Sequence, residues 1–150
     1  WAKPVSVNSR FFKNPKVGMA VTAFAGPLAN IILAFIAYAI LTLMPIIFPN
    51  AILTSNFLYY LIYFLDFFVT INISLAVFNL IPIPPFDGSR ILGYFLPDRI
   101  YYKIMQYEQI IYIVVLVALW AGFLSGPIST VTDAVFNFFY NMFSTLLGGF

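Results

Sequence analysis

Four long stretches of this sequence contain no charged side chain: residues 17–65, 67–86, 109–132 and 134–150. A helix that crosses a bilayer needs about 20 consecutive, mostly apolar residues, and the first stretch is long enough for more than one such helix. Charged residues form only 8% of the 150-residue chain, whereas soluble domains contain roughly 25%. So few charges cannot cover a soluble surface, and the sequence therefore predicts a membrane protein.

Prolines and polar residues divide these stretches into four predicted spanning helices, at 17–44, 57–80, 107–124 and 128–147. Pro45 and Pro49 are expected to end the first helix and Pro82 the second, because proline lacks the backbone N–H that a helix interior needs. A short amphipathic helix is expected at 89–95. The prediction is an all-α, polytopic membrane protein that forms one domain over residues 1–150.

The fourth predicted helix is the most polar of the four. Asp133, Asn137 and Asn141 recur every four residues and give it a polar stripe. A helix with one polar face can lie along the membrane interface instead of crossing the bilayer. The sequence leaves both arrangements open for residues 128–147.

Basic residues indicate the orientation in the membrane. All seven Lys and Arg residues fall within 1–16 and 88–103, and the segments 45–56 and 125–127 contain none. With four spans, both basic segments lie on one side, which the positive-inside rule identifies as the cytosol. The sequence thus predicts a multi-pass protein of the cell membrane, embedded in the lipid bilayer, with both basic segments in the cytosol.

Composition excludes several kinds of function. The net charge of +2 is too small to indicate nucleic-acid binding. The chain has no Cys, which excludes disulfides and cysteine nucleophiles, and no His, the commonest metal ligand and general base. Any enzymatic interpretation must explain this lack of histidine.

The first predicted helix carries small or polar residues at every fourth position: Gly18, Thr22, Gly26, Asn30 and Ala34. Such a stripe lets a second helix approach closely, and packing alone would explain it. Asn30 is less ordinary, since a carboxamide at membrane depth needs hydrogen-bond partners. It could donate to the backbone of a bound substrate.

The second predicted helix carries Asp66, Asn72 and Asn79, and the two asparagines share one face. Hydrogen bonds between helices are the ordinary explanation for asparagines at this depth. Asp66 stands alone among apolar residues, where an ionisable group is a functional candidate by default. It could instead be protonated or lie near the far interface.

The segment PIPPFDGSR, residues 82–90, is the most informative part of the sequence. Its three prolines are expected to hold an extended, stiff backbone directly after a membrane helix. Asp87 follows, and then Gly88, which is free to turn. Asp87 could cap the next short helix through its side chain, or it could be a carboxylate held rigidly as a metal ligand.

Residues 1–8, WAKPVSVN, alternate weakly between apolar and polar side chains. They could form an edge strand, whose free backbone groups can pair with an extended peptide. They could equally be a basic juxtamembrane segment that contacts anionic lipid headgroups.

Three segments together resemble the site-2 protease family of intramembrane zinc metalloproteases: WAKPVSVN at 1–8, AGPLAN at 25–30 and FNLIPIPPFDGSR at 78–90. The resemblance is strongest to the short prokaryotic members without a PDZ domain, and it extends to about residue 95. It implies that Asp87 is a zinc ligand. It also implies that Gly26 and Asn30 form the family's GxxxN motif, whose Asn helps to position the substrate. Phe86 stands where the family usually has Leu, which is an apolar exchange.

The resemblance also reveals a departure from the family pattern. Family members hold zinc with two histidines of an upstream HExxH helix as well as the aspartate, and this chain has no His. A catalytic zinc needs about three protein ligands, so the chain as given is not expected to catalyse alone. Its start at Trp1 rather than Met favours a chain from which the upstream segment is missing.

These observations favour part of an intramembrane zinc metalloprotease that cleaves transmembrane or membrane-proximal peptide bonds of a transmembrane protein substrate. The zinc site would be completed by ligands outside this chain, and a metal-activated water would be the nucleophile. Two alternatives stay open. One is a non-catalytic membrane scaffold of the same family, with Asp87 as a helix cap, and the other is a small transporter subunit that uses Asp66.

Overall fold

The computed structural model describes residues 12–49 and 55–148, and all regular structure within them is helical. The helices are α1 (Pro15–Ile47), α3 (Asn56–Asn79), α4 (Asp87–Phe95), α5 (Asp98–Gln106), α6 (Glu108–Trp120) and α7 (Ser125–Leu146). The predicted all-α class is confirmed for this part of the chain. The edge strand considered for residues 1–8 lies outside the described residues.

Helix α1 begins at a strong start signal. The side chain of Asn14 accepts a hydrogen bond from the backbone N–H of Val17 at 3.4 Å, and Pro15 follows as the first helical residue. Proline suits that position because its missing N–H would have no partner there. The helix then continues through Pro45 and leaves helical geometry at Phe48, so the expectation that Pro45 ends the helix is wrong.

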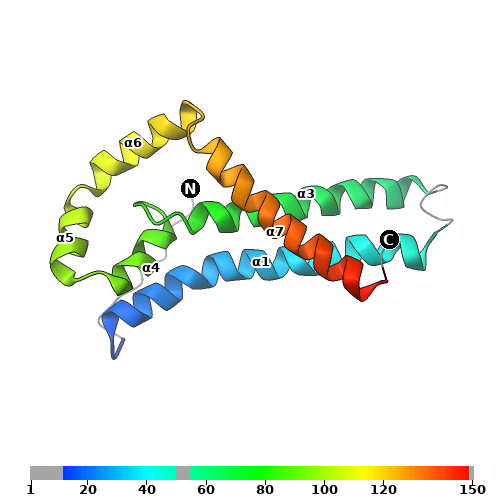
Figure 1. The fold of residues 1–150 in the computed structure, drawn as a ribbon, viewed down its shortest axis with the longest axis horizontal. Helices are drawn as coiled ribbons and strands as arrows, with labels where there is room; N and C mark the ends of the chain where they lie inside the picture. Colours follow the sequence, from blue (N-terminus) through cyan, green and yellow to red (C-terminus); the bar gives the residue numbers. More distant parts are fainter. Residues whose placement is uncertain (1–11, 50–54, 149–150) are drawn as a thin grey trace.

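Helices α1 and α3 lie side by side and form the main helix pair (Figure 1). Ala34 of α1 and Val69 and Ile73 of α3 have no exposed surface at all. A small side chain on one helix lets the backbone of the other come close, which is how helices pack where lipid replaces water. The tightest part of the molecule is therefore the α1–α3 contact.

Helix α7 crosses this pair (Figure 1) and packs mainly on α3, with aromatic contacts to α1. Phe139, which is 2% exposed, is the one side chain of α7 that is buried in the described structure. Its ring meets the ring of Phe35 edge-on at a centroid distance of 5.5 Å and that of Tyr38 at 5.8 Å. Such aromatic pairs contribute about 0.5–1.5 kcal/mol each beyond the area they bury.

Helices α5 and α6 meet at an angle of 66° and pack on little else. Val115 is the buried residue of α6, and α5 has none within the described structure. The 13 residues of α6 extend about 20 Å, which is less than the roughly 30 Å of hydrocarbon core. The straight spanning helix expected at 107–124 is therefore replaced by a bend and a shorter helix.

In the described residues, α1 and α3 are long and apolar enough to cross a membrane, and the bent α5–α6 pair would be a third span if it acts as one. Helix α7 is not among these candidate spans, as its stripe of Asp133, Asn137 and Asn141 anticipates. Four spans are thus not confirmed, whereas two or three are supported. The short helix expected at 89–95 is present as α4 and begins two residues earlier, at Asp87.

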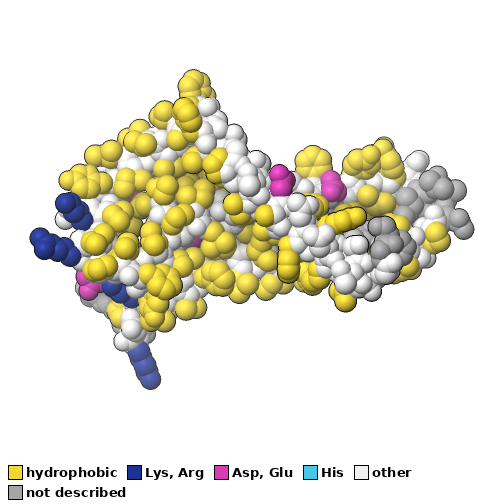
Figure 2. Space-filling model, in the orientation of Figure 1, with side chains coloured by type: hydrophobic (Ala, Val, Ile, Leu, Met, Phe, Trp, Pro, Cys, Tyr) yellow, Lys and Arg dark blue, Asp and Glu magenta, His cyan; other side chains and the backbone are white. Residues whose placement is uncertain are grey.

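Lys and Arg side chains gather at one end of the molecule, where α1 begins and where α4 and α5 lie (Figure 2). This basic end contains Lys13, Lys16, Arg90, Arg99 and Lys103. Within it, Lys16 forms an ion pair with Asp98 and donates a hydrogen bond to the carbonyl oxygen of Leu96 at 3.1 Å. The one-sided placement of charge agrees with the predicted orientation, and the cytosolic assignment itself stays a prediction.

The stripe of small residues on α1 does not act as one contact surface for α3. Gly26 and Thr22 are exposed, and Ala34 is the one member that is buried. A repeat of four residues drifts by about 40° per step around a helix of 3.6 residues per turn. Gly18 and Ala34 therefore face different sides, and the middle of the stripe borders an open flank of α1.

Candidate metal-ligating site

A tight turn, rather than an extended segment, connects α3 to α4. The backbone N–H of Phe86 donates to the carbonyl oxygen of Ile83 at 3.1 Å, and the Pro84–Pro85 peptide bond is cis. The extended backbone expected for the three prolines is therefore wrong, because the chain reverses within the proline segment. The ring of Phe86 packs edge-on against Phe78 of α3, with centroids 4.4 Å apart, and this contact fixes the turn against the helix.

Gly88 brings the start of α4 directly against the end of α3. A Cβ atom at this position would lie 2.3 Å from the carbonyl oxygen of Leu80 and 2.4 Å from that of Ile81. Both contacts are to backbone, which cannot move aside as a flexible side chain can. Gly88 has no positive φ, so the glycine is required for close approach and not, as expected, for freedom to turn.

Asp87 is the first residue of α4, and its side chain makes no capping hydrogen bond. The alternative in which Asp87 caps the short helix is therefore wrong. Its carboxylate is directed at α1, since a Cβ atom placed on Gly26 would lie 3.9 Å from Oδ2 of Asp87. The residue is half-buried, and among the described residues the structure gives it no ion pair. The carboxylate thus faces α1 without an ion-pair partner among the residues that the structure describes.

The flank of α1 beside this carboxylate is open and lined by small side chains. Ala25, Gly26 and Ala29 are exposed, while Asn30 is half-buried one turn further along the helix. The side chain of Asn30 forms no hydrogen bond to another residue in the described part of the chain. The structure therefore brings Gly26 and Asp87 together, with Asn30 one helical turn from Gly26 on α1.

The structure gives the other polar candidates no contact with Asp87 among the described residues. Asn72 is buried in the helix pair, but its Nδ2 donates to the carbonyl oxygen of Phe68 in its own helix at 2.8 Å. This bond differs from the contact between helices expected for Asn72. Asn79 is half-buried near the end of α3, and Asp66 is exposed on α3.

This chain alone does not offer a complete zinc site. No group of three or more Asp or Glu side chains that could hold a metal exists in residues 12–49 and 55–148, and the whole sequence lacks His and Cys. A catalytic zinc needs about three protein ligands. Asp87, whose carboxylate faces α1 and has no ion pair in the described residues, fits one of these ligands and no more.

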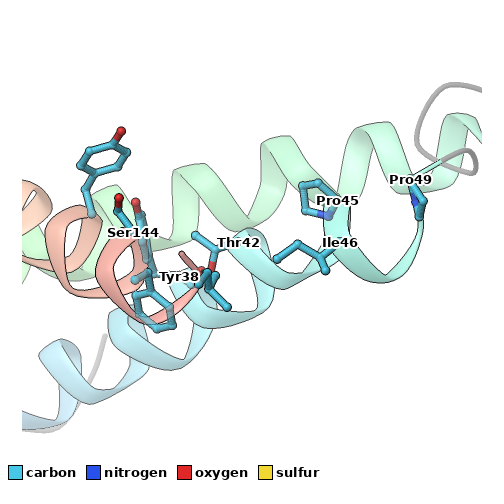
Figure 3. Close-up of a pocket in the computed structure, with 9 residues that line it drawn as sticks. Tyr38, Thr42, Pro45, Ile46, Pro49 and Ser144 are labelled. Atoms are coloured by element: carbon cyan, nitrogen blue, oxygen red, sulfur yellow. The ribbon is translucent and has the colours of Figure 1, made fainter. Parts of the chain in front are cut away.

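A large cavity of the described structure lies elsewhere. It has a volume of about 590 Å³ and lies between the second half of α1 and the end of α7, with Tyr38, Thr42 and Ser144 in its wall (Figure 3). Along α1, the distance from Gly26 to Tyr38 is about 18 Å at 1.5 Å per residue. Its walls are mostly apolar, so it contributes nothing to a site built on Asp87.

Sequence reasoning missed two features that position Asp87. One is the backbone contact of Gly88 described above. The other is Ser89, a buried residue whose hydroxyl donates to the carbonyl oxygen of Phe86 at 2.7 Å and so fastens the turn to the first turn of α4. A Ser three residues after a turn residue is a recurring local bond, which is the signal that could have indicated it.

Fold and site together define a class: a helical protein with membrane-spanning helices that holds one carboxylate against a glycine on the open flank of a spanning helix. Comparison with known proteins agrees with this class. The sequence profile of Peptidase family M50 matches residues 45–122. The chain belongs to this family, the site-2 proteases.

Two relatives illustrate the extent of the similarity. "Putative zinc metalloprotease YwhC" of Bacillus subtilis is 33% identical over 151 residues, which cover 98% of this chain and 68% of that protein. "Putative zinc metalloprotease MJ0611" of Methanocaldococcus jannaschii is 44% identical over 71 residues, which cover 47% of this chain and 31% of that protein. No solved structure matches the chain significantly. The chain thus aligns with about two thirds of the first relative and under one third of the second.

Proposed function

We propose that this chain is part of an intramembrane zinc metalloprotease and that Asp87 is one of the zinc ligands. The observation that carries the proposal is the carboxylate itself, which neither caps a helix nor pairs with a described cation, and which faces Gly26 at close range. Membership of Peptidase family M50 supports the reaction class, and the names of the two relatives support zinc. The remaining ligands and the general base come from residues outside this chain.

The chemistry that zinc supplies in such a site is activation of a water molecule and polarisation of the scissile carbonyl group. The residues of this chain perform the positioning. Gly88 seats the first turn of α4 on the last carbonyls of α3, and the bond from Ser89 to Phe86 keeps that turn closed. Together they set where the oxygens of Asp87 lie relative to α1, and ligand positions must hold within about 0.5 Å for a metal site to work.

The substrate that this geometry favours is a transmembrane segment of another protein, unwound near the bond to be cleaved. The exposed small residues Ala25, Gly26 and Ala29 leave room for an extended backbone to lie along α1 beside Asp87. A carboxamide offers both donors and an acceptor, so Asn30 would hold that backbone in place. Larger side chains on this flank would keep the substrate away from the carboxylate.

The test uses the full-length protein purified from membranes, with zinc per polypeptide measured by elemental mass spectrometry. Asp87→Asn keeps the shape of the side chain and removes the charge that attracts zinc. We expect its zinc content to fall below about one tenth of the wild-type value, because a three-ligand site loses one ligand. Cleavage of a co-expressed single-span reporter protein should fall by roughly a hundredfold or more.

Asp133→Asn is the matched control, since Asp133 is an exposed acid on α7 and the substitution is the same. It should leave zinc content and cleavage at the wild-type level. If Asp87→Asn retains its zinc, the ligand assignment is wrong. If the wild-type protein itself contains no zinc and cleaves nothing, the alternative of a non-catalytic scaffold replaces the protease.

A further inference from the structure

A second pocket, of about 350 Å³, opens at the basic end of the molecule where three helices meet. Helix α1 contributes Lys16, helix α4 contributes Arg90 and Tyr94, and helix α5 contributes Tyr101 and Tyr102. Its volume lies in the range of small-ligand sites. No acidic side chain lines it.

The two cations of the pocket are held differently. Lys16 is anchored by Asp98 and by the carbonyl oxygen of Leu96. Arg90 is exposed, and the structure gives it no ion pair within residues 12–49 and 55–148. A guanidinium group presents its N–H donors as a planar fork that matches the oxygens of a phosphate group. The guanidinium N–H groups of Arg90 therefore line the pocket without an acidic partner in the described residues.

Gly93 and three tyrosines give the pocket its shape. A Cβ atom on Gly93 would lie 2.4 Å from the ring of Tyr101, so the absence of a side chain at Gly93 lets this ring settle against α4. Tyr94 and Tyr102 are exposed at the rim. Tyrosine favours the depth of lipid headgroups, where the ring contacts hydrocarbon and the hydroxyl reaches water and polar groups.

Helix α5 gives the depth of the pocket in the membrane. It is short and amphipathic, carries Arg99 and Lys103, and buries none of its residues in the described structure. A basic amphipathic helix of this kind lies at the membrane interface, with its apolar face toward the acyl chains. The pocket beneath it therefore opens at the level of the phosphate groups, on the membrane side where the basic residues lie.

We propose that this pocket binds the headgroup of an anionic phospholipid, with Arg90 and Lys16 on its phosphate. Charge complementarity carries the choice of occupant: Arg90 has no ion pair in the described residues, Lys16 adds a second cation that is partly offset by Asp98, and tyrosines line the pocket. Basic pockets between membrane helices are a general means of binding anionic headgroups. The bound lipid links α1, α4 and α5, and it does so without touching Asp87.

The experiment is a titration of the full-length protein in uncharged detergent, with short-chain phosphatidylglycerol or phosphatidylcholine, followed by native mass spectrometry. The wild-type protein should retain one phosphatidylglycerol more tightly than phosphatidylcholine. Arg90→Gln should weaken the binding of phosphatidylglycerol about tenfold, which corresponds to about 1.4 kcal/mol. Arg90→Lys should recover only part of it, because the ammonium group lacks the fork.

Arg99→Gln is the matched control, because it removes an exposed arginine on the same side of the membrane without lining this pocket. It should change the affinity for phosphatidylglycerol by roughly twofold or less, since exposed charges at a distance are screened. Gly93→Ala keeps every charge and displaces the ring of Tyr101, so it should weaken binding as well.

Equal losses in the Arg90→Gln and Arg99→Gln variants would overturn the proposal, because they would indicate general surface charge rather than a pocket. Inorganic phosphate serves as the separate probe. If it binds to the wild-type protein as tightly as phosphatidylglycerol does and is lost in Arg90→Gln, the site binds a free anion and the lipid assignment is wrong. Equal affinity for phosphatidylcholine and phosphatidylglycerol would also overturn it.

Discussion

The inner helices α1, α3 and α4 and the outer helices α5, α6 and α7 are both rich in apolar residues, yet they pack very differently. Among the inner helices, Ala34 and Ile73 have no exposed surface, and Gly88 lies directly on backbone carbonyls. Among the outer helices, the buried side chains of the described structure are Val115 and Phe139. The large apolar side chains of α6 instead face outward.

This difference shows which residues specify a structure in lipid. Large apolar side chains favour the bilayer as much as a neighbouring helix, so they place a helix in the membrane without fixing its partners. Small residues and glycines at contacts determine which backbones can approach. The inner helices have these residues at Ala34, Ala37 and Gly88, and they also hold the candidate ligand Asp87.

The largest expected effect on stability comes from a Gly→Ala substitution, made once among the inner helices and once among the outer helices. Gly88→Ala would drive a Cβ atom into the carbonyl oxygens of Leu80 and Ile81, so it should destabilise the protein by about 3 kcal/mol and remove its zinc. Gly126→Ala on α7 meets nothing within 4 Å and should change stability by about 0.5 kcal/mol at most. Thermal unfolding of the full-length protein in detergent measures both.

Equal shifts in the unfolding temperature for the two glycine variants would remove the distinction between inner and outer helices. Zinc content separates the remaining outcomes. A stable Gly88→Ala protein without zinc would show that the contact serves to position Asp87. A stable variant with full zinc would show that the backbone contact is unimportant for the site.

A smaller effect is expected at the attachment of α7. Phe139→Ala removes the buried ring that meets Phe35 and Tyr38. The substitution should lower the free energy of unfolding by about 2 kcal/mol. This is below the roughly 3–5 kcal/mol typical of soluble cores, because lipid can fill part of the space. Helix α7 should move away from α3, as measured by the distance between spin labels on the two helices, while zinc content stays unchanged.

Phe138→Ala is the control for this prediction, since Phe138 is the neighbouring ring on α7 and is 64% exposed. It should leave the distance between the labels unchanged. Loss of zinc in the Phe139→Ala protein would contradict the comparison, because the outer helices would then hold the site as firmly as the inner ones.

The smallest effect concerns the one ion pair that joins the two regions in the described residues. Lys16→Gln and Asp98→Asn should each reduce stability by about 0.5–1 kcal/mol, because the pair is largely exposed and screened by salt. The double variant should lose no more than either single variant, which a double-mutant cycle of unfolding temperatures measures. Lys13→Gln, which removes an exposed charge nearby, should have no effect.

The sequence was sufficient for features set by local patterns. Long charge-free stretches predicted α1 and α3, and the short helix near Asp87 followed from the prolines before it. Helix α5 was not predicted, although Pro97 and Asp98 are a typical helix start. The small-residue stripe does not meet a single partner helix: Ala34 is buried against α3 and Gly26 faces Asp87 of α4, because a four-residue repeat drifts around a helix with 3.6 residues per turn.

The residues of the candidate site stay a prediction, and their geometry could not be predicted from the sequence. The family resemblance indicated Gly26, Asn30 and Asp87 separately, whereas the contact between Gly26 and Asp87 exists only once α4 is seated beside α1. The turn after α3 could not be predicted either, because proline restricts φ without deciding between an extended and a turned backbone. The basic pocket depends on three helices meeting and has no signal within any one of them.

The contact of Gly88 with the end of α3 couples the backbone at Asp87 to the position of α3. Helix α3 has 24 residues and is about 36 Å long, so turning it by about 5° about its far end would displace the Gly88 end by about 3 Å. Helix α1 has 33 residues, and helices of unequal length respond unequally to bilayer thickness by tilting. A bilayer whose thickness tilted α3 relative to α1 would therefore change the distance between Asp87 and Gly26.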